Sequence, residues 1–177
     1  VRNAETGLRS EIVYVPLQSF SDRELKWALS RNKPDSLFNE NPYAHYHEIP
    51  FLTIRRAVKI RHLYLMQRTG EAIPPTIGTE PWHLPLEVQV FRLGQDVAIV
   101  GLPGEIFTEL SLSIRNASSF KTTMVVECTN TLLPYVPVKG AFKQGSYETI
   151  NSRLAPGGGE MLAETAVKLL QELKPGK

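Results

Sequence analysis

The chain has 177 residues, of which 42% are hydrophobic and 21% charged, a composition typical of a globular protein with one packed core. Its formal net charge of +2 is too small to indicate a nucleic-acid-binding protein, and no run approaches the ~18 apolar residues of a membrane span. We therefore exclude nucleic acid as a partner and a transmembrane segment, and we expect residues 1–177 to form a single unit.

The only cysteine, Cys128, cannot form an internal disulfide bond. It lies in the strand-like segment 122–129, and a nucleophilic role would need a base that the sequence does not place nearby. The pattern therefore predicts a small buried hydrophobe. The chain begins at Val1 without an initiator methionine or a signal-peptide pattern, which leaves open whether it is a fragment of a longer protein.

The first half of the chain predicts one strand and two helices. Residues 11–17 are rich in β-branched and aromatic side chains, which favours a strand. Ser21 and Glu24 have the spacing of a capping box, which marks the start of a helix. Pro50 is suited to the first position of a longer helix that reaches Arg68. Loops are expected where proline and glycine or asparagine gather, in residues 34–49 and 70–85.

The second half predicts a hairpin, two helices and a further buried strand. In chain order these are an alternating strand at 86–93, a turn at 94–96, an apolar strand at 97–102, a helix at 106–117, a buried strand at 122–129, an irregular segment at 130–153 and a helix at 159–173. Strands and helices of this kind predict a mixed α/β fold, in which a layered mixed sheet packs against helices.

Glu105 is the carboxylate that most suggests a site. It ends the run 97–105, in which an apolar strand leads through a Pro-Gly turn to the amphipathic segment 106–117. The residue thus falls at the carboxyl end of a strand, where open α/β sheets place ligands and metals. Alternatively, Glu105 belongs to the first helical turn and only complements the helix dipole, by about 0.3 to 1 kcal/mol.

Three of the histidines have a context that can be weighed. His45 and His47 would point the same way on a strand, as paired metal ligands do, but they lack acidic or cysteine partners at a fitting offset. A solvated aromatic loop is the better interpretation. His62 shares a helical face with Arg55 and Lys59, and this spacing favours a solvated face over a surface that binds anionic lipid.

Two other features indicate no site. His83 has no partner that the sequence identifies. The run Gly157–Gly159 precedes a helix, but it lacks the lysine and hydroxyl of a P-loop and does not follow a strand, so it predicts a flexible helix entry. No Gly-x-Ser-x-Gly motif occurs in the sequence, which removes the usual signature of a serine hydrolase.

Two tyrosines strengthen the interpretation of Glu105 as a site residue. Tyr135 follows a predicted strand as Glu105 does, and Tyr147 lies twelve positions later. Loops at strand ends gather at one edge of a sheet, so we expect the three side chains to converge. A carboxylate and a phenol are unusual together as metal ligands, although oxygen donors do bind Zn²⁺.

The runs 97–108 and 130–136, followed by Tyr147-Glu148, resemble the neutral/alkaline non-lysosomal ceramidase family. The resemblance covers roughly residues 86–173, which correspond to the last stretch of that family's catalytic domain. It implies that the chain is the C-terminal portion of a ceramidase-like catalytic domain.

The resemblance also implies a chemistry. In that family the glutamate after Pro-Gly and the tyrosine before valine bind zinc alongside two upstream histidines, which implies that Glu105 and Tyr135 are metal ligands. The family's later tyrosine, near the scissile amide carbonyl, corresponds to Tyr147, a catalytic candidate. The implied function is part of a zinc-dependent N-acyl amide hydrolase that cleaves a lipid-like substrate, in ceramidases N-acylsphingosine, into a sphingoid base and a fatty acid.

The sequence departs from the family at several points. The family's zinc histidines and serine nucleophile have no counterpart that we can place in this chain, so we expect it to need the upstream part of the same protein and to be inactive alone. Leu132 and the pair Pro137-Val138 replace an aromatic residue and two threonines, which predicts a different pocket wall. The resemblance suggests a secreted, periplasmic or membrane-associated location.

A second hypothesis comes from another functional class. The chain could be a non-catalytic α/β binding or structural module that uses the basic helix face of Arg55, Lys59 and His62 for interaction.

Overall fold

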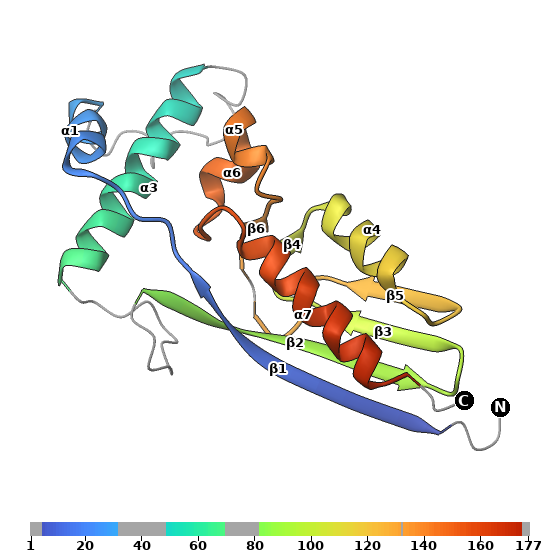
Figure 1. Cartoon of the computed structure of the whole chain (residues 1–177). Helices are drawn as coiled ribbons and strands as arrows, with labels where there is room; N and C mark the ends of the chain where they lie inside the picture. The colour runs from blue at the N-terminus through green and yellow to red at the C-terminus, as the bar shows by residue number, and fades with distance from the viewer. Residues whose placement is uncertain (1–4, 32–48, 70–81, 132, 175–177) are drawn as a thin grey trace.

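A computed structural model describes residues 5–31, 49–69, 82–131 and 133–174 (Figure 1). The elements in chain order are β1 (Thr6–Pro16), α1 (Asp22–Ser30), α3 (Ile49–Thr69), β2 (His83–Leu93), β3 (Val97–Gly101), β4 (Glu105–Ile106), α4 (Thr108–Ala117), β5 (Thr122–Val126), β6 (Tyr135–Val136), α5 (Ala141–Gln144), α6 (Tyr147–Asn151) and α7 (Gly158–Glu172).

Within the described residues, four strands form one mixed sheet in the order β1-β2-β3-β5. The first three are antiparallel neighbours, and β5 runs parallel to β3 because α4 provides the crossover between them. The predicted hairpin of β2 and β3 is confirmed, with Gly94 at a positive φ of 65° in its turn. β1 begins earlier than residues 11–17 predicted, because it pairs with β2 along its full length. The expected mixed α/β class is confirmed.

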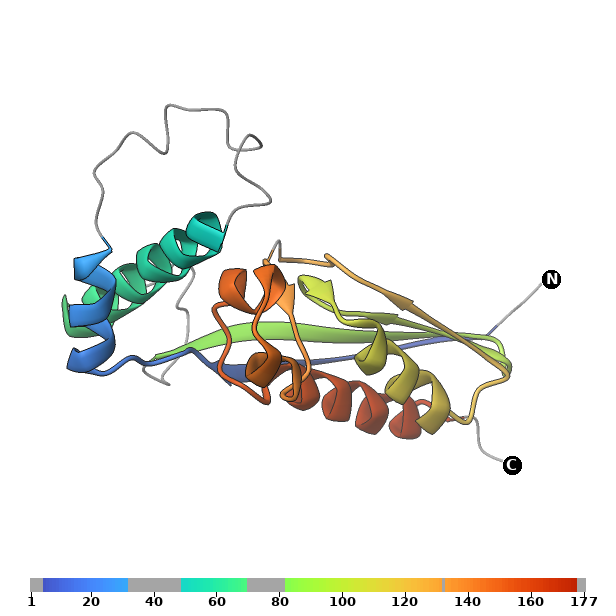
Figure 2. The same cartoon turned by 90° about the horizontal axis from the view of Figure 1, so that it is seen from above.

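The hydrophobic core lies between one face of this sheet and the helices α4 and α7 (Figures 1 and 2). Side chains of β2 alternate between buried and partly exposed, as the period of two in a strand requires. Helix α7 contributes the buried stripe that its sequence spacing predicted, with Leu162, Ala166, Leu169 and Leu173 all below 8% exposed. Each fully buried aliphatic side chain of this kind stabilises the fold by roughly 1.5 to 3 kcal/mol.

The prediction of a flexible helix entry at Gly157–Gly159 was wrong. Gly158 and Gly159 belong to α7 and are buried. A Cβ atom on Gly158 would lie 2.6 Å from Val15 Cγ1, and one on Gly159 would lie 2.7 Å from Leu110 Cδ1. The glycines are therefore needed for close approach of α7 to β1 and α4.

Helices α1 and α3 pack on each other beside the sheet layer (Figure 2). The predicted capping box at the start of α1 is confirmed, because Ser21 Oγ accepts from the Glu24 backbone N–H and the Glu24 side chain accepts from the Ser21 backbone. Helix α3 has the predicted extent. None of the described helices is long and apolar enough to cross a membrane.

The opposite face of the sheet carries exposed apolar side chains. Leu8, Ile12, Phe91 and Met124 are 38% to 56% exposed. Leu8 and Ile12 belong to β1, Phe91 to β2 and Met124 to the edge strand β5, and Leu8 pairs with Phe91. Strand β5 is an edge strand of the described sheet with alternating exposure, so the prediction of a fully buried strand at 122–129 was wrong.

Cys128 also differs from its prediction. Its strand-like segment predicted a small buried hydrophobe, but the residue is exposed. Strand β5 ends at Val126, and Cys128 lies in a turn with a φ of 57°. Its backbone N–H donates to Gly104 O over 3.0 Å, which ties this turn to the segment that leads to Glu105.

Candidate functional site

A sharp turn at Gly104 brings the segment after β3 against the segment that leads into β6. Gly104 has a φ of 78°, a conformation that disfavours other residues. A Cβ atom here would lie 2.9 Å from both Leu133 Cβ and Pro134 O. Only glycine therefore allows the two segments to approach this closely.

The turn places Glu105 in a short parallel strand pair. Strand β4 pairs with β6 so that Glu105 stands opposite Tyr135 and Ile106 opposite Val136. The backbone N–H of Ile106 donates to Glu127 Oε2 at 2.8 Å. The alternative that placed Glu105 in the first turn of a helix was wrong, because α4 begins at Thr108.

The side chains of Glu105 and Tyr135 interact directly. The pKa of the Tyr135 phenol is raised, first by burial and then by the negative charge of Glu105, with further contributions from Tyr147 and from a hydrogen bond to the Glu105 carboxylate. The structure thus brings the two predicted metal ligands together, both as oxygen donors.

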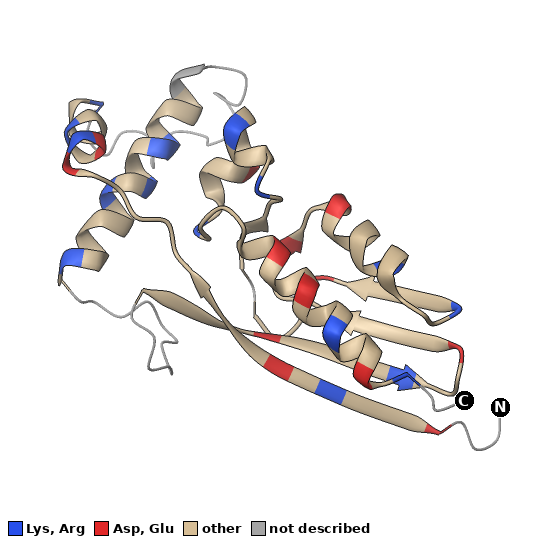
Figure 3. Ribbon diagram, viewed as in Figure 1, with Lys and Arg blue, Asp and Glu red and all other residues tan. Residues whose placement is uncertain are grey.

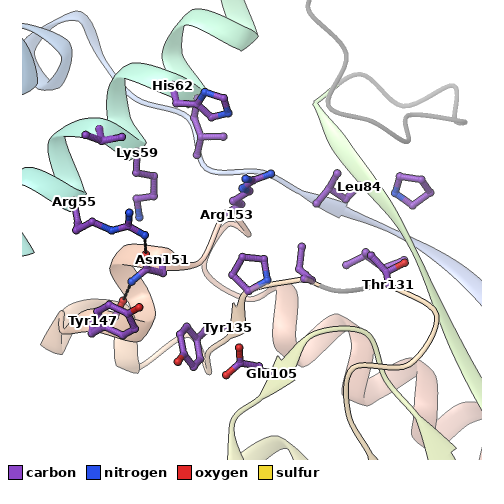
Figure 4. A pocket seen from close by; sticks show the side chains of 16 residues that line it. Arg55, Lys59, His62, Leu84, Glu105, Thr131, Tyr135, Tyr147, Asn151 and Arg153 are labelled. Atoms are coloured by element: carbon purple, nitrogen blue, oxygen red, sulfur yellow. Dashed lines mark hydrogen bonds between the residues drawn. The ribbon is translucent and has the colours of Figure 1, made fainter. Parts of the chain in front are cut away.

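Tyr147 lies beside Tyr135. The ring centroids are 5.8 Å apart and the planes meet at 73°, an edge-to-face contact typical of aromatic pairs. Tyr147 is the first residue of α6, and its carbonyl oxygen accepts a hydrogen bond of 2.8 Å from Asn151 Nδ2. Asn151 Oδ1 in turn accepts from Arg55 Nη2 at 2.7 Å. This chain of bonds ties the catalytic candidate to α3 (Figure 4).

All three predicted site residues line one cavity of about 670 Å³ (Figure 4). The cavity lies between α3, the start of β2, Thr131 with residues 133–135, and the end of α6. Its apolar lining includes Leu84, Pro85, Leu86 and Leu133. Its basic lining comprises Arg55, Lys59 and His62 from α3, together with Arg153 (Figure 4). Figure 3 shows lysine and arginine at positions along α3.

The basic face of α3 is therefore more than a solvated helix surface. Arg55 and His62 are exposed, as predicted, whereas Lys59 is partly buried. Lys59 Nζ donates to Gln18 Oε1 at 3.0 Å and to Thr149 O at 3.1 Å. Burial, and secondly the positive charge of Arg56, lowers the pKa of Lys59 to about 8.

The other histidines add no metal ligands that the structure describes. His45 and His47 lie outside the described residues, and His83 begins β2 without lining the cavity. In the described ranges no group of three or more histidine, cysteine, aspartate or glutamate side chains could hold a metal ion. Glu105 and Tyr135 are thus two neighbouring oxygen donors at the cavity.

Several residues around the site were missed by the sequence analysis. Glu127 follows β5 as Glu105 follows β3, and this shared position was the signal that could have identified it. With Glu105 and Tyr135 it lines a second hollow of about 500 Å³ beside the main cavity. Asn151 and Arg153 gave no signal, since they lie in the segment that the sequence analysis considered irregular.

No protein-family model matches the chain, and a comparison with curated proteins found no match. Two of the solved structures with a similar fold are ceramidases. Neutral ceramidase from Pseudomonas aeruginosa is 18% identical, with a TM-score of 0.52 over 98% of this chain and 30% of its own. A ceramidase complexed with C2 is 17% identical, with a TM-score of 0.51 over 98% of this chain and 31% of its own.

These similarities show a shared fold. The chain spans about 30% of the length of the ceramidase chains that it matches. It therefore has the fold of part of a ceramidase, with Glu105, Tyr135 and Tyr147 gathered at one cavity of that fold.

Proposed function

We propose that the chain is part of a ceramidase-like, zinc-dependent hydrolase of N-acyl amides. The observation that carries the proposal is the register of β4 and β6, which places Glu105 beside Tyr135, with Tyr147 in ring contact, at a cavity of a ceramidase-like fold. The motif resemblance of the sequence supports the same function.

Glu105 and Tyr135 would hold the metal ion. Both are oxygen donors that line the same cavity, and they stand opposite each other in the β4–β6 register. Zn²⁺ accepts oxygen donors at about 2.0 to 2.2 Å but prefers four ligands, so the remaining donors would come from another part of the protein. When bound, the ion would polarise the amide carbonyl and activate a nucleophile.

Tyr147 would act on the reacting amide. Its ring lies against Tyr135, and its backbone is fixed by Asn151, so the phenol has a defined position near the proposed ligands. A phenol O–H that donates to the developing oxyanion stabilises the transition state, and loss of such a donor typically lowers the rate by about 10² to 10³. We assign this role to Tyr147.

The decisive experiment compares the full-length protein with its Glu105→Gln variant. Zinc content would be measured by atomic absorption, and turnover with a long-chain N-acyl amide of sphingosine. Because the substitution removes the carboxylate charge and keeps the shape, we expect zinc content and turnover to fall together. Glu164→Gln, an exposed change on α7 that lines neither hollow, is the matched control. Full zinc content and full activity in Glu105→Gln would refute the proposal.

The alternative of a non-catalytic module is less well supported. The basic face of α3 contributes to the lining of the cavity that holds Glu105 and the two tyrosines. Two of the matching solved structures are ceramidases, which are enzymes. If the full-length protein neither bound zinc nor hydrolysed amides, the non-catalytic module would be the favoured hypothesis.

A further inference from the structure

One side of the cavity is basic. Arg55, Lys59 and His62 follow one another at helical spacing along α3 and line the cavity, and Arg153, just beyond α6, lies near them (Figure 4). Among the described lining residues, Glu105 is the one carboxylate. In Figure 4 it lies on the side away from α3, next to Tyr135.

The cations Arg55, Lys59 and Arg153 have no acidic partner in the part of the chain that the structure describes. Arg55 donates to the neutral amide oxygen of Asn151, and Lys59 donates to neutral carbonyl oxygens. The ion pairs of the described residues involve other cations, for example Lys168 with Glu11. The lowered pKa of Lys59, caused by burial and by Arg56, fits a basic region without a compensating carboxylate. The described part of the cavity wall thus presents positive charge without an ion-pair partner to a molecule that enters it.

The other side of the cavity is apolar. Leu84, Pro85 and Leu86 belong to the start of β2, and Leu133 and Pro134 precede β6. Figure 4 shows Leu84 on the opposite side of the cavity from Arg55, with Tyr135 below the gap between them. A molecule that fits this distribution has an apolar chain, a central polar group near the tyrosines and an anionic end.

We propose that the cavity selects N-acyl amides whose amine portion carries a carboxylate, with the acyl chain along the β2 side and the carboxylate against Arg55 and Arg153. This inference rests on the proposed hydrolase function. Guanidinium groups match carboxylates in geometry and charge, and they remain charged at every physiological pH. Hydrolysis would add water across the amide C–N bond and release a fatty acid and a free amino acid.

The test uses the full-length protein and two substrates of similar size. N-dodecanoylglycine carries the carboxylate, and N-dodecanoylethanolamine replaces it with a neutral hydroxyl group. We expect kcat/KM to be at least ten-fold higher for the glycine conjugate at low ionic strength. The preference should shrink in 0.5 M salt, because salt screens charges that solvent can reach.

Substitution of Arg153 locates the effect. The ratio of kcat/KM for the glycine conjugate to kcat/KM for the ethanolamine conjugate should fall at least ten-fold in Arg153→Gln. Arg153→Lys should keep much of this preference because the positive charge is kept. Arg55→Gln provides a second variant if Arg153→Gln does not fold, as judged by circular dichroism. Arg115→Gln, an exposed change on α4 outside the cavity, is the control and should leave the ratio as in the wild type.

The outcomes separate the inference from the proposed function. Hydrolysis of the neutral amide without preference for the glycine conjugate would overturn the inference and leave the hydrolase standing. A preference that persists in both Arg153→Gln and Arg55→Gln would overturn the assignment to this basic wall. Hydrolysis of neither substrate, nor of an N-acylsphingosine, would overturn both.

Discussion

Glu105 and Tyr135 stand directly opposite each other in a parallel pair of two-residue strands. Their positions depend on backbone pairing between segments thirty residues apart in sequence. The Gly104 turn, which no residue with a Cβ atom could occupy without displacing Leu133 or Pro134, sets that pairing. The distance between the proposed metal ligands is thus fixed by the backbone.

Tyr147→Phe should separate catalysis from metal binding. The change removes only the phenol O–H, and the ring contact with Tyr135 is kept. We expect kcat to fall by about 10² to 10³ while zinc content stays at the wild-type level. Steady-state kinetics and metal analysis of the same preparation would check this. Unchanged kcat would remove Tyr147 from the mechanism.

The isolated chain of residues 1–177 should bind Zn²⁺ weakly. Glu105 and Tyr135 leave a tetrahedral shell half filled, and the described residues contain no cluster of three or more metal-binding side chains. Calorimetric titration of the metal-free chain would measure the affinity. Tight one-to-one binding would mean that residues such as His45 or His47 complete the site.

Gly104→Ala should damage both stability and the site. The alanine Cβ atom would meet Leu133 and Pro134 at 2.9 Å, and the φ of 78° disfavours any side chain. We expect the free energy of unfolding to fall by about 1 to 3 kcal/mol and zinc content of the full-length protein to decrease.

Gly140→Ala is the matched control for that change. Gly140 has a helical φ of −63°, and no atom lies within 4 Å of an added Cβ atom. The substitution should be neutral or stabilise by up to about 1 kcal/mol. Equal losses in the two variants, measured by urea unfolding, would contradict the proposed role of the Gly104 turn.

Lys59 should make the free energy of unfolding depend on pH in the alkaline range. Its pKa is about 8 in the folded protein and near 10.5 in the unfolded chain, so the unfolded state binds more protons between these values. The stability of the wild type relative to Lys59→Met should therefore rise as the pH increases from 8 to 10.5, by ~1 to 3 kcal/mol. Below pH 8 the buried charge keeps its full unfavourable effect.

Urea unfolding of both proteins at pH 7 and pH 10 would measure this difference. Lys121→Met removes a lysine from an exposed site and serves as the control. If the wild type and Lys59→Met keep the same difference at both pH values, Lys59 is not held as a buried cation.

Local patterns predicted much of the fold. The β2–β3 hairpin, the capping box at Ser21 and the buried stripe of α7 each depend on residues close in sequence, and each was confirmed. The three site residues do line one cavity, as expected, but through the β4–β6 pairing and the position of α6 and not through the ends of strands in one sheet. Their chemical roles remain predictions.

The errors came from contacts between distant segments. Strand β4 has two residues and exists only because it pairs with β6, so no local pattern could place Glu105 in a strand. Gly158 and Gly159 are needed for close contact with Val15 and Leu110. The local sequence around three consecutive glycines does not reveal these distant contacts. Arg153 lines the cavity because the chain turns beside it after α6 ends at Asn151, and no local sequence pattern predicts that turn.

The exposed apolar face of the sheet affects how the isolated chain will behave in solution. Leu8, Phe91 and Met124 lie on one face of the sheet, on β1, β2 and β5, and β5 leaves an unpaired edge within the described sheet. Apolar faces beside free edges promote self-association between copies. Recombinant residues 1–177 should therefore form concentration-dependent oligomers, and replacing Phe91 and Met124 with lysine should keep the chain monomeric at higher concentrations.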